Sequence, residues 1–334
     1  MGTVGRGVVV IGMIALVAAL GACSSDDSAD PPPGGRATTT APAPADADAD
    51  ADAGMTAISV LGGPDWLAVD GDDLYVRTDN GGVHRIDAST SKVVGSIDVE
   101  GETCQGLGAA FDSVWTCSDH DVVRIDRSLD AITAQIPVDK VFEQGTLAGG
   151  FDRLWVLTGD GSRLVGIDPA TNAPDPPIEL GVRGSDLAVS DDGIWVSSYV
   201  SSAAAFVDPT TRTVTKRVEG LDDPTGVAIA DDGGVWFGGA TTARVDPATA
   251  TVVATIPVGP GPDGAIATEG NRLWIRSGVR FLEQFDAATG EAIGDWDVPN
   301  GVTSGGDVTF AGDAVWTSAY DDATVFRIEP FPTR

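Results

Sequence analysis

The side chains of this sequence that could act in catalysis or bind a ligand are a histidine between two aspartates, several dispersed carboxylates and several large aromatic residues. Carboxylate oxygens are the ligands that Mg²⁺ and Ca²⁺ prefer, aromatic faces attract organic cations, and a loop histidine can act as a general base. Ten such residues lie in connections between repeated segments: Asp65, Trp66, Asp119, His120, Asp121, Asp186, Tyr199, Asp263, Asp307 and Tyr320. They can act together only if the fold brings these connections to one place.

A single recurring aromatic residue indicates what that fold is. Tyr75, Trp115, Trp155, Trp195, Trp236, Trp274 and Trp316 follow one another at spacings of 40, 40, 40, 41, 38 and 42 residues. An acid preceded by an apolar residue comes ten to thirteen residues after each of them, as in Ile86-Asp87. Each repeat contains four short apolar segments separated by turn residues, which predicts four strands. Four strands repeated at this period are typical of a β-propeller.

The last repeat lacks its fourth strand, and the beginning of the domain supplies a replacement. Residues 57–65 match residues 255–263 in their order of a short strand, a glycine-rich turn and a Pro-Asp pair. We therefore expect an all-β, seven-bladed propeller of four-stranded antiparallel blades, whose last blade is closed by the N-terminal strand. A six-bladed ring with one stray repeat is the alternative.

This architecture predicts where the ten candidates meet. In a four-stranded blade, the connections between blades and the turns between the second and third strands emerge on the same face of the ring. The connections between blades contain Asp65, Trp66, Asp186, Asp263 and Asp307, and the turns contain Asp119, His120, Asp121, Tyr199 and Tyr320. We expect an acidic, partly aromatic funnel that binds a small cationic ligand or a protein and needs no cofactor; Mg²⁺ or Ca²⁺ at the funnel mouth is an alternative. Polar loops that bind nothing are the alternative.

Other repeated features have structural explanations. The recurring aromatic is expected to pack between neighbouring blades. Turns such as Asp168-Pro-Ala-Thr171 predict an aspartate that accepts local backbone N–H bonds. Cys104 and Cys117 lie at ends of antiparallel strands on one side of the second repeat, so we expect a disulfide between them in an exported domain.

Residues 224–237 and 262–275 carry a pattern that resembles a known family. The stretch Pro-Thr-Gly-Val-Ala-Ile-Ala-Asp-Asp-Gly-Gly-Val-Trp-Phe and its counterpart Pro-Asp-Gly-Ala-Ile-Ala-Thr-Glu-Gly-Asn-Arg-Leu-Trp-Ile resemble repeats of the YVTN/virginiamycin B lyase-like (streptogramin lyase) propellers. The resemblance extends over residues 57–331. It implies the fold, whereas proteins of this kind serve as lyases, sensors and binding platforms.

The resemblance leaves enzyme activity open. The lyases are metal-assisted eliminases that use a His and a Glu of a late blade. The two histidines of this chain, His84 and His120, fall in the first two repeats, so no lyase catalytic residue is carried over. The residues favour a protein that is not an enzyme. A Mg²⁺-dependent lyase-like enzyme using His120, and a sensor that partners a membrane protein, are the alternatives.

The beginning of the chain predicts export and lipidation. Residues 1–22 hold Arg6 and an apolar run from Val8 to Leu20, which is typical of a signal peptide. The run ends in Leu20-Gly-Ala-Cys23, which resembles the lipobox of bacterial lipoproteins and implies that Cys23 carries diacylglycerol and a further acyl chain such as palmitate. Residues 23–54, rich in Pro, Ala and Asp, are expected to be a disordered tether, and residues 55–334 form the propeller.

Charge limits the partners of the domain. The chain has 20 Lys and Arg against 50 Asp and Glu, a net charge of −30, which excludes a nucleic-acid binder that works by phosphate neutralisation. Residues 55–334 alone carry net −25, which favours cationic or basic partners. Together, the predicted signal peptide, the lipidated Cys23 and the acidic propeller lead us to expect a monomeric extracytoplasmic lipoprotein. It is anchored to a bacterial cell membrane, and its propeller is a ligand-binding or scaffold module.

Lipidation has a direct test. Replacement Cys23→Ala removes the thiol that carries the lipid, so the variant should leave the membrane fraction, whereas the original chain should stay in it. Immunoblotting of fractionated cells measures this. Membrane association that is unchanged in Cys23→Ala would disprove a lipid anchor at this residue.

Overall fold

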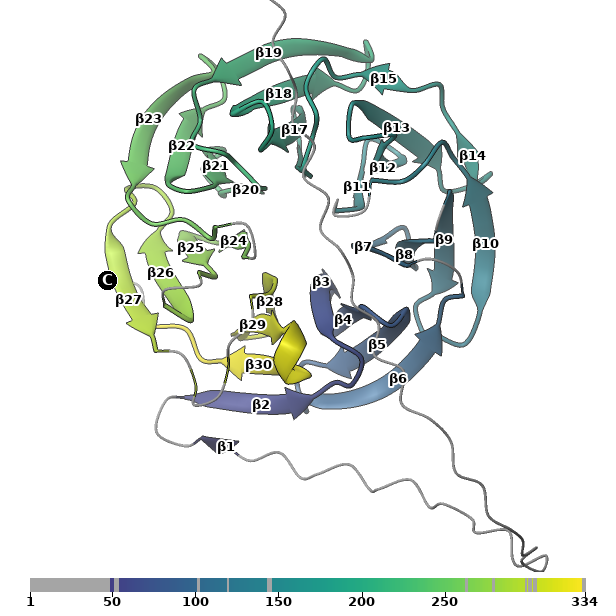
Figure 1. The fold of residues 1–334 in the computed structure, drawn as a ribbon, viewed down its shortest axis with the longest axis vertical. Helices are drawn as coiled ribbons and strands as arrows, with labels where there is room; N and C mark the ends of the chain where they lie inside the picture. The colour runs from purple at the N-terminus through teal and green to yellow at the C-terminus, as the bar shows by residue number, and fades with distance from the viewer. Residues whose placement is uncertain are drawn as a thin grey trace, which may run out of the picture. The chain divides into compact units, whose positions relative to one another are not determined.

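The chain forms seven antiparallel sheets arranged as blades around a central channel (Figure 1). The structure is a computed structural model that describes residues 49–50, 54–100, 103–118, 120–142, 146–261, 264–277, 280–297, 299, 302 and 305–331. Within each blade, consecutive strands pair with one another from the channel outward. The predicted all-β, seven-bladed propeller is confirmed, and the six-bladed alternative is wrong.

The first three blades follow the chain from its N-terminal side. Blade 1 contains β3 (Pro64–Asp70), β4 (Asp73–Thr78), β5 (Gly82–Asp87) and β6 (Lys92–Asp98). Blade 2 contains β7 (Thr103–Ala110), β8 (Ser113–Ser118), β9 (Asp121–Asp126) and β10 (Ile132–Pro137). Blade 3 contains β11 (Ala148–Gly150), β12 (Arg153–Thr158), β13 (Arg163–Asp168), β14 (Ala173–Pro174) and β15 (Ile178–Glu179). Its outer edge is divided in two because the intervening prolines have no N–H to donate to a ladder.

The next three blades each have four strands. Blade 4 contains β16 (Asp186–Ser190), β17 (Gly193–Ser198), β18 (Ala203–Asp208) and β19 (Thr213–Glu219). Blade 5 contains β20 (Gly226–Ile229), β21 (Val235–Gly238), β22 (Thr242–Asp246) and β23 (Thr251–Ile256). Blade 6 contains β24 (Ile266–Glu269), β25 (Arg272–Ile275), β26 (Leu282–Asp286) and β27 (Ala292–Trp296).

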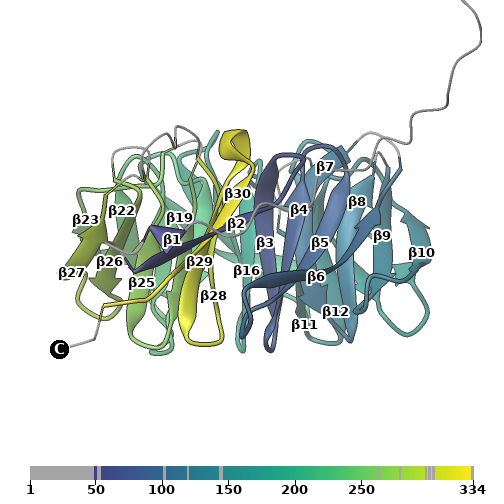
Figure 2. The same ribbon diagram turned by 90° about the horizontal axis from the view of Figure 1, so that it is seen from below.

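Blade 7 joins the two ends of the domain. Its inner strands are β28 (Val308–Ala311), β29 (Ala314–Ala319) and β30 (Thr324–Ile328), and a short 3₁₀ helix, η1 (Tyr320–Asp322), lies between the last two. Strand β2 (Met55–Ser59) pairs along β30, from Met55 opposite Ile328 to Ser59 opposite Thr324. A two-residue strand, β1 (Ala49–Asp50), pairs in turn with β2. Figure 2 shows β2 beside the last blade, and closure by the N-terminal strand is confirmed.

The recurring aromatic is the centre of each interface between blades. All seven of these side chains are at most 1% exposed. Several of the indole N–H groups donate to a backbone carbonyl, as from Trp155 to Gly150 at 3.0 Å and from Trp236 to Ala287 at 2.9 Å. The core is therefore divided among the blade interfaces, and these aromatics are structural, as the sequence predicted.

The acids that follow the ladder in each repeat are also structural. The Asp168 carboxylate accepts the amides of Ala170 at 2.8 Å and Thr171 at 3.2 Å, which closes the turn into the outer strand. Asp208, Asp246 and Asp286 do the same in their own blades. These hydrogen bonds favour the ionised form and hold the pKa of the Asp208 carboxyl below its usual range. The predicted aspartate turns are confirmed.

Cys104 and Cys117 form the expected disulfide, with their Cα atoms 5.5 Å apart. Strand β7 already begins at Thr103, so Cys104 lies inside the strand rather than just before it. The pairing of β7 with β8 shifts register between Thr103 and Leu107, where three residues of β7 face a single residue of β8. This bulge brings Cys104 toward Cys117, although a regular hairpin would not place the two residues opposite each other.

Several predictions concern residues that lie outside the described ranges. Cys23 and the signal peptide are among them, as are Asp119 and Asp263. No helix of the described part of the chain is long and apolar enough to cross a membrane.

Candidate functional site at the channel mouth

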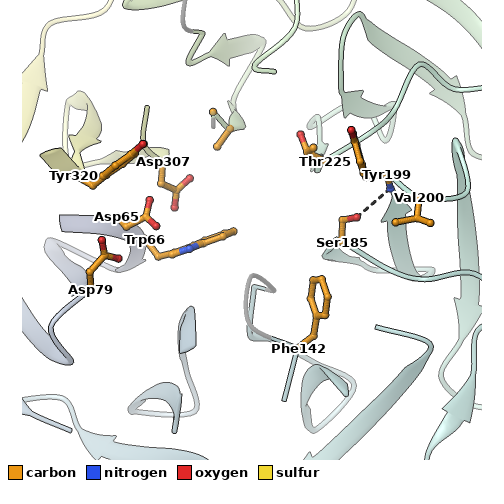
Figure 3. Close-up of a pocket in the computed structure, with 13 residues that line it drawn as sticks. Asp65, Trp66, Asp79, Phe142, Ser185, Tyr199, Val200, Thr225, Asp307 and Tyr320 are labelled. Carbon is orange, nitrogen blue, oxygen red and sulfur yellow. Dashed lines mark hydrogen bonds between the residues drawn. The ribbon is translucent and has the colours of Figure 1, made fainter. Parts of the chain in front are cut away.

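A cavity of about 610 Å³ opens where the connections between blades surround the channel. Figure 3 shows Asp65, Asp79, Asp307 and Tyr320 on one side and Ser185, Tyr199, Val200 and Thr225 on the other, with the Trp66 ring extending between them. The lining residues come from six of the seven blades and their connections: Asp65, Trp66, Asp79, Phe142, Ser185, Tyr199, Val200, Thr225, Gly264, Ala265, Gly306, Asp307 and Tyr320. We refer to this cavity as the mouth.

A bulge in the innermost strand of blade 1 places Asp65 and Trp66 in the mouth. Strand β3 pairs with β4 in shifted register between Pro64 and Leu67, so two residues of β3 face one residue of β4. The extra residue bends the strand and turns its side chains toward the channel. The Trp66 side chain packs partly against the core of blades 1 and 2, which fixes its base while the ring borders the mouth. Its indole N–H is buried and has no hydrogen-bond acceptor among the described residues.

Asp307 joins the last blade to the first at the floor of the mouth. Its carboxylate accepts the amide of Leu67, in β3, at 2.9 Å and the amide of Val308 at 2.7 Å. Burial, with smaller contributions from the nearby carboxylates of Asp65 and Asp186, raises the pKa of Asp307 to about 7 against the opposing effect of the two amides. The group therefore titrates near neutral pH and gains from any cation that enters the mouth.

Asp186 makes the same kind of link between other blades. Its carboxylate accepts the Thr146 hydroxyl, from the connection into blade 3, at 2.5 Å and the Val227 amide, in blade 5, at 3.1 Å. Burial is the main cause that raises the pKa of this carboxyl as well. Asp186 and Asp307 thus hold the innermost strands in position while they add negative potential to the channel.

The opposite wall of the mouth is apolar and exposed. Tyr199 and Val200 lie in the turn after β17 and are 46% and 61% exposed. The Tyr199 amide donates to the Ser185 hydroxyl at 3.0 Å, which ties this turn to the connection between blades 3 and 4. Phe142, from the connection between blades 2 and 3, adds a second aromatic ring. The mouth therefore combines carboxylates on one side with apolar rings on the other.

The ten candidates from the sequence divide into three groups. Asp65, Trp66, Tyr199, Asp307 and Tyr320 line the mouth, and Asp186 lies among the strands below it. His120 is exposed on the turn before β9, where its carbonyl accepts the Val138 amide, and neither it nor Asp121 lines the mouth. Asp119 and Asp263 are outside the described residues.

Eight of the thirteen lining residues were not among the ten candidates, and Phe142 and Val200 are the large apolar ones of these eight. Phe142 belongs to a long connection between blades whose sequence does not follow the repeat. An isolated bridge between Val141 and Thr158 fixes this connection beside blade 3. Val200 directly follows Tyr199, and an apolar pair in a turn that should be polar was the available signal.

The described residues do not fit a metal ion. Nowhere among them do three or more His, Cys, Asp or Glu side chains gather in a group that could hold one. Both carboxylate oxygens of Asp307 are instead engaged with backbone amides, whereas Mg²⁺ and Ca²⁺ need several converging oxygen ligands.

A second hollow, of about 910 Å³, lies at the opposite end of the blades, around the turns between first and second strands of blades 3, 4 and 5. Phe151 and Asp191 are among its lining residues and are exposed. They provide matched controls for substitutions in the mouth.

The titration of Asp307 predicts a pH-dependent stability. Because its pKa is raised, the unfolded chain loses this proton near pH 4 while the folded chain keeps it until about pH 7. The contribution to the free energy of unfolding is complete below pH 4 and is lost as the pH rises through 7. Asp307→Asn should therefore lose less thermal stability than the original chain between pH 5 and 8, as measured by circular dichroism.

Asp191→Asn, which removes an exposed charge, should behave like the original chain; equal pH profiles for all three proteins would contradict the prediction.

Comparisons with solved structures establish the fold. A streptogramin B lyase matches 82% of this chain and 96% of its own length, with a TM-score of 0.67 and 13% identity. Virginiamycin B lyase from Staphylococcus aureus matches 83% of this chain and 99% of its own, with a TM-score of 0.68 and 14% identity. BamB from Moraxella catarrhalis matches 80% and 84%, with a TM-score of 0.58 and 16% identity. No protein-family model and no curated protein matches the sequence. The chain thus has the fold of the streptogramin lyases, as its repeats predicted, and at these identities the likeness is one of fold.

Proposed function

We propose that this chain is an extracytoplasmic, lipid-anchored binding protein whose propeller recognises a cationic ligand or protein group at the mouth. Cys23 would carry the anchor, residues 24–54 would be the tether, and residues 55–334 would be the recognition domain. The observation that carries the proposal is the arrangement of the Trp66 ring beside the carboxylates of Asp65 and Asp307 in an open cavity.

The chemistry of the mouth favours a cation. A positive group over the Trp66 ring gains from the ring quadrupole, and it gains more when carboxylates lie at the same place. Asp307 is costly to ionise in the free protein because it is buried beside other acids. A bound cation removes part of that cost, and the net charge of the whole chain increases the rate at which cations arrive.

A binding role is better supported than a lyase role. No histidine is among the residues that line the mouth, and His120 lies on an exposed turn. The described residues also provide no group for the metal that such an elimination needs.

The disulfide supports the extracytoplasmic location. Cys104 and Cys117 are paired and almost completely buried. Such bonds form and persist in oxidising compartments and are rare in the reducing cytosol. The pair agrees with the export that residues 1–22 predict.

Titration with argininamide, a small guanidinium cation, tests binding at the mouth. In nuclear magnetic resonance spectra of the full chain in non-ionic detergent, the indole N–H signal of Trp66, assigned with Trp66→Phe, should shift in a saturable manner. Asp65→Asn should weaken this binding by about tenfold, because it removes one attractive charge from the mouth. Asp191→Asn, the same change on the opposite face, should leave it unaltered. If the Trp66 signal does not move, or if both variants weaken binding equally, the proposal is wrong.

A further inference from the structure

The two most exposed large apolar side chains of the described residues, Leu61 and Val200, lie in connections on the face of the ring that carries the mouth. Leu61 is 74% exposed and Val200 is 61% exposed, more than any other large hydrophobic residue of the described ranges, and Tyr199 beside Val200 is 46% exposed. Leu61 lies in the connection between β2 and β3, next to Gly62 and Gly63, whose carbonyls accept the amides of Asn80 and Asp79. Apolar groups collected on one face of a domain mark an interaction surface.

Val200 lines the mouth, whereas Leu61 lies outside its lining, in a connection on the side of Asp79. Val200 follows β17 in blade 4, whereas Leu61 precedes β3 at the junction of blades 7 and 1, next to the turn that holds Asp79. Figure 3 shows Val200 and Asp79 on opposite sides of the cavity. A small cation that fills the mouth would leave Leu61 in water. An occupant that covers Leu61 together with Tyr199 and Val200 must be wider than the cavity and apolar around its charged centre.

A polypeptide loop has these properties. An Arg or Lys side chain has an apolar stem that suits the Tyr199 and Phe142 wall and a charged end that suits Asp65 and Asp307. Aromatic residues at the centre of a depression, with exposed apolar contacts around them, are typical of the residues that dominate protein interfaces.

We infer that the partner is a protein whose loop inserts one Arg or Lys side chain into the mouth and covers Leu61, Tyr199 and Val200 with neighbouring apolar residues. The inference rests on the proposed function and names the class of partner for the same site. Charge complementarity selects a basic loop, and the apolar flanks select a polypeptide over a free small cation.

Selection of loops against the full chain tests the inference. The probe is a phage-displayed library of seven-residue loops closed by a disulfide, selected on the full chain in nanodiscs. We expect the enriched loops to contain Arg or Lys next to apolar residues and to bind at least about tenfold more tightly than argininamide. Leu61→Ser, outside the lining of the mouth, should weaken loop binding but not argininamide binding, and Asp65→Asn should weaken both. Phe151→Ser and Asp191→Asn, the matched changes on the opposite face, should weaken neither.

The possible failures are distinct. Argininamide that binds as tightly as any loop, with no effect of Leu61→Ser on loop binding, would overturn the protein partner and leave the proposed function standing. Enriched loops without a basic residue, or loops sensitive only to Phe151→Ser, would overturn it too. If neither loops nor argininamide respond to Asp65→Asn, the proposed function fails together with the inference. Thermal unfolding of each variant identifies any that does not fold.

Discussion

Closure of the ring is the constraint on which the rest of the structure depends. Each blade packs its aromatic against a neighbour, so the first and last blades bury their faces only when the ends of the chain meet. Two contacts hold the ends of the ring together, one near its outer edge and one near the channel. The outer one is the pairing of β2 with β30, and the inner one is the Asp307 carboxylate, which accepts the Leu67 amide of blade 1. The channel mouth exists because both ends of the ring are held.

The same inner contact connects structure to recognition. Asp307 must lie near the channel to reach Leu67, and that position buries its carboxyl beside Asp65. Asp186 repeats the arrangement between blades 4 and 5, which indicates that an acid at this register is a general device for joining innermost strands. Its consequence is a channel whose structural acids are also its source of negative potential. The bulge at Asp65 and Trp66 then adds an aromatic surface beside them.

Much of the fold followed from sequence spacing, and less of the site did. The ladder from Tyr75 to Trp316 determines the number of blades, and the match between residues 57–65 and 255–263 predicts the closing strand. Five candidate residues line the mouth because the connections between blades share one face. The repeat spacing could not show that His120 lies outside the mouth, since a turn on the correct face of the ring need not border the channel. Bulges were equally hidden, because a register shift depends on the pairing of whole strands and carries no fixed residue signal.

Proton release on binding is the measurement that tests the central claim most directly. If a cation binds beside Asp307, whose pKa is raised to about 7 by burial, it favours the ionised carboxylate and displaces a proton. Calorimetric titration of the full chain with argininamide at pH 7, in buffers of different ionisation enthalpy, reports that proton. The account predicts a binding enthalpy that changes with the buffer in the sense of proton release, and no such change for Asp307→Asn. A binding enthalpy that is independent of the buffer, or a dependence that persists in Asp307→Asn, would contradict it.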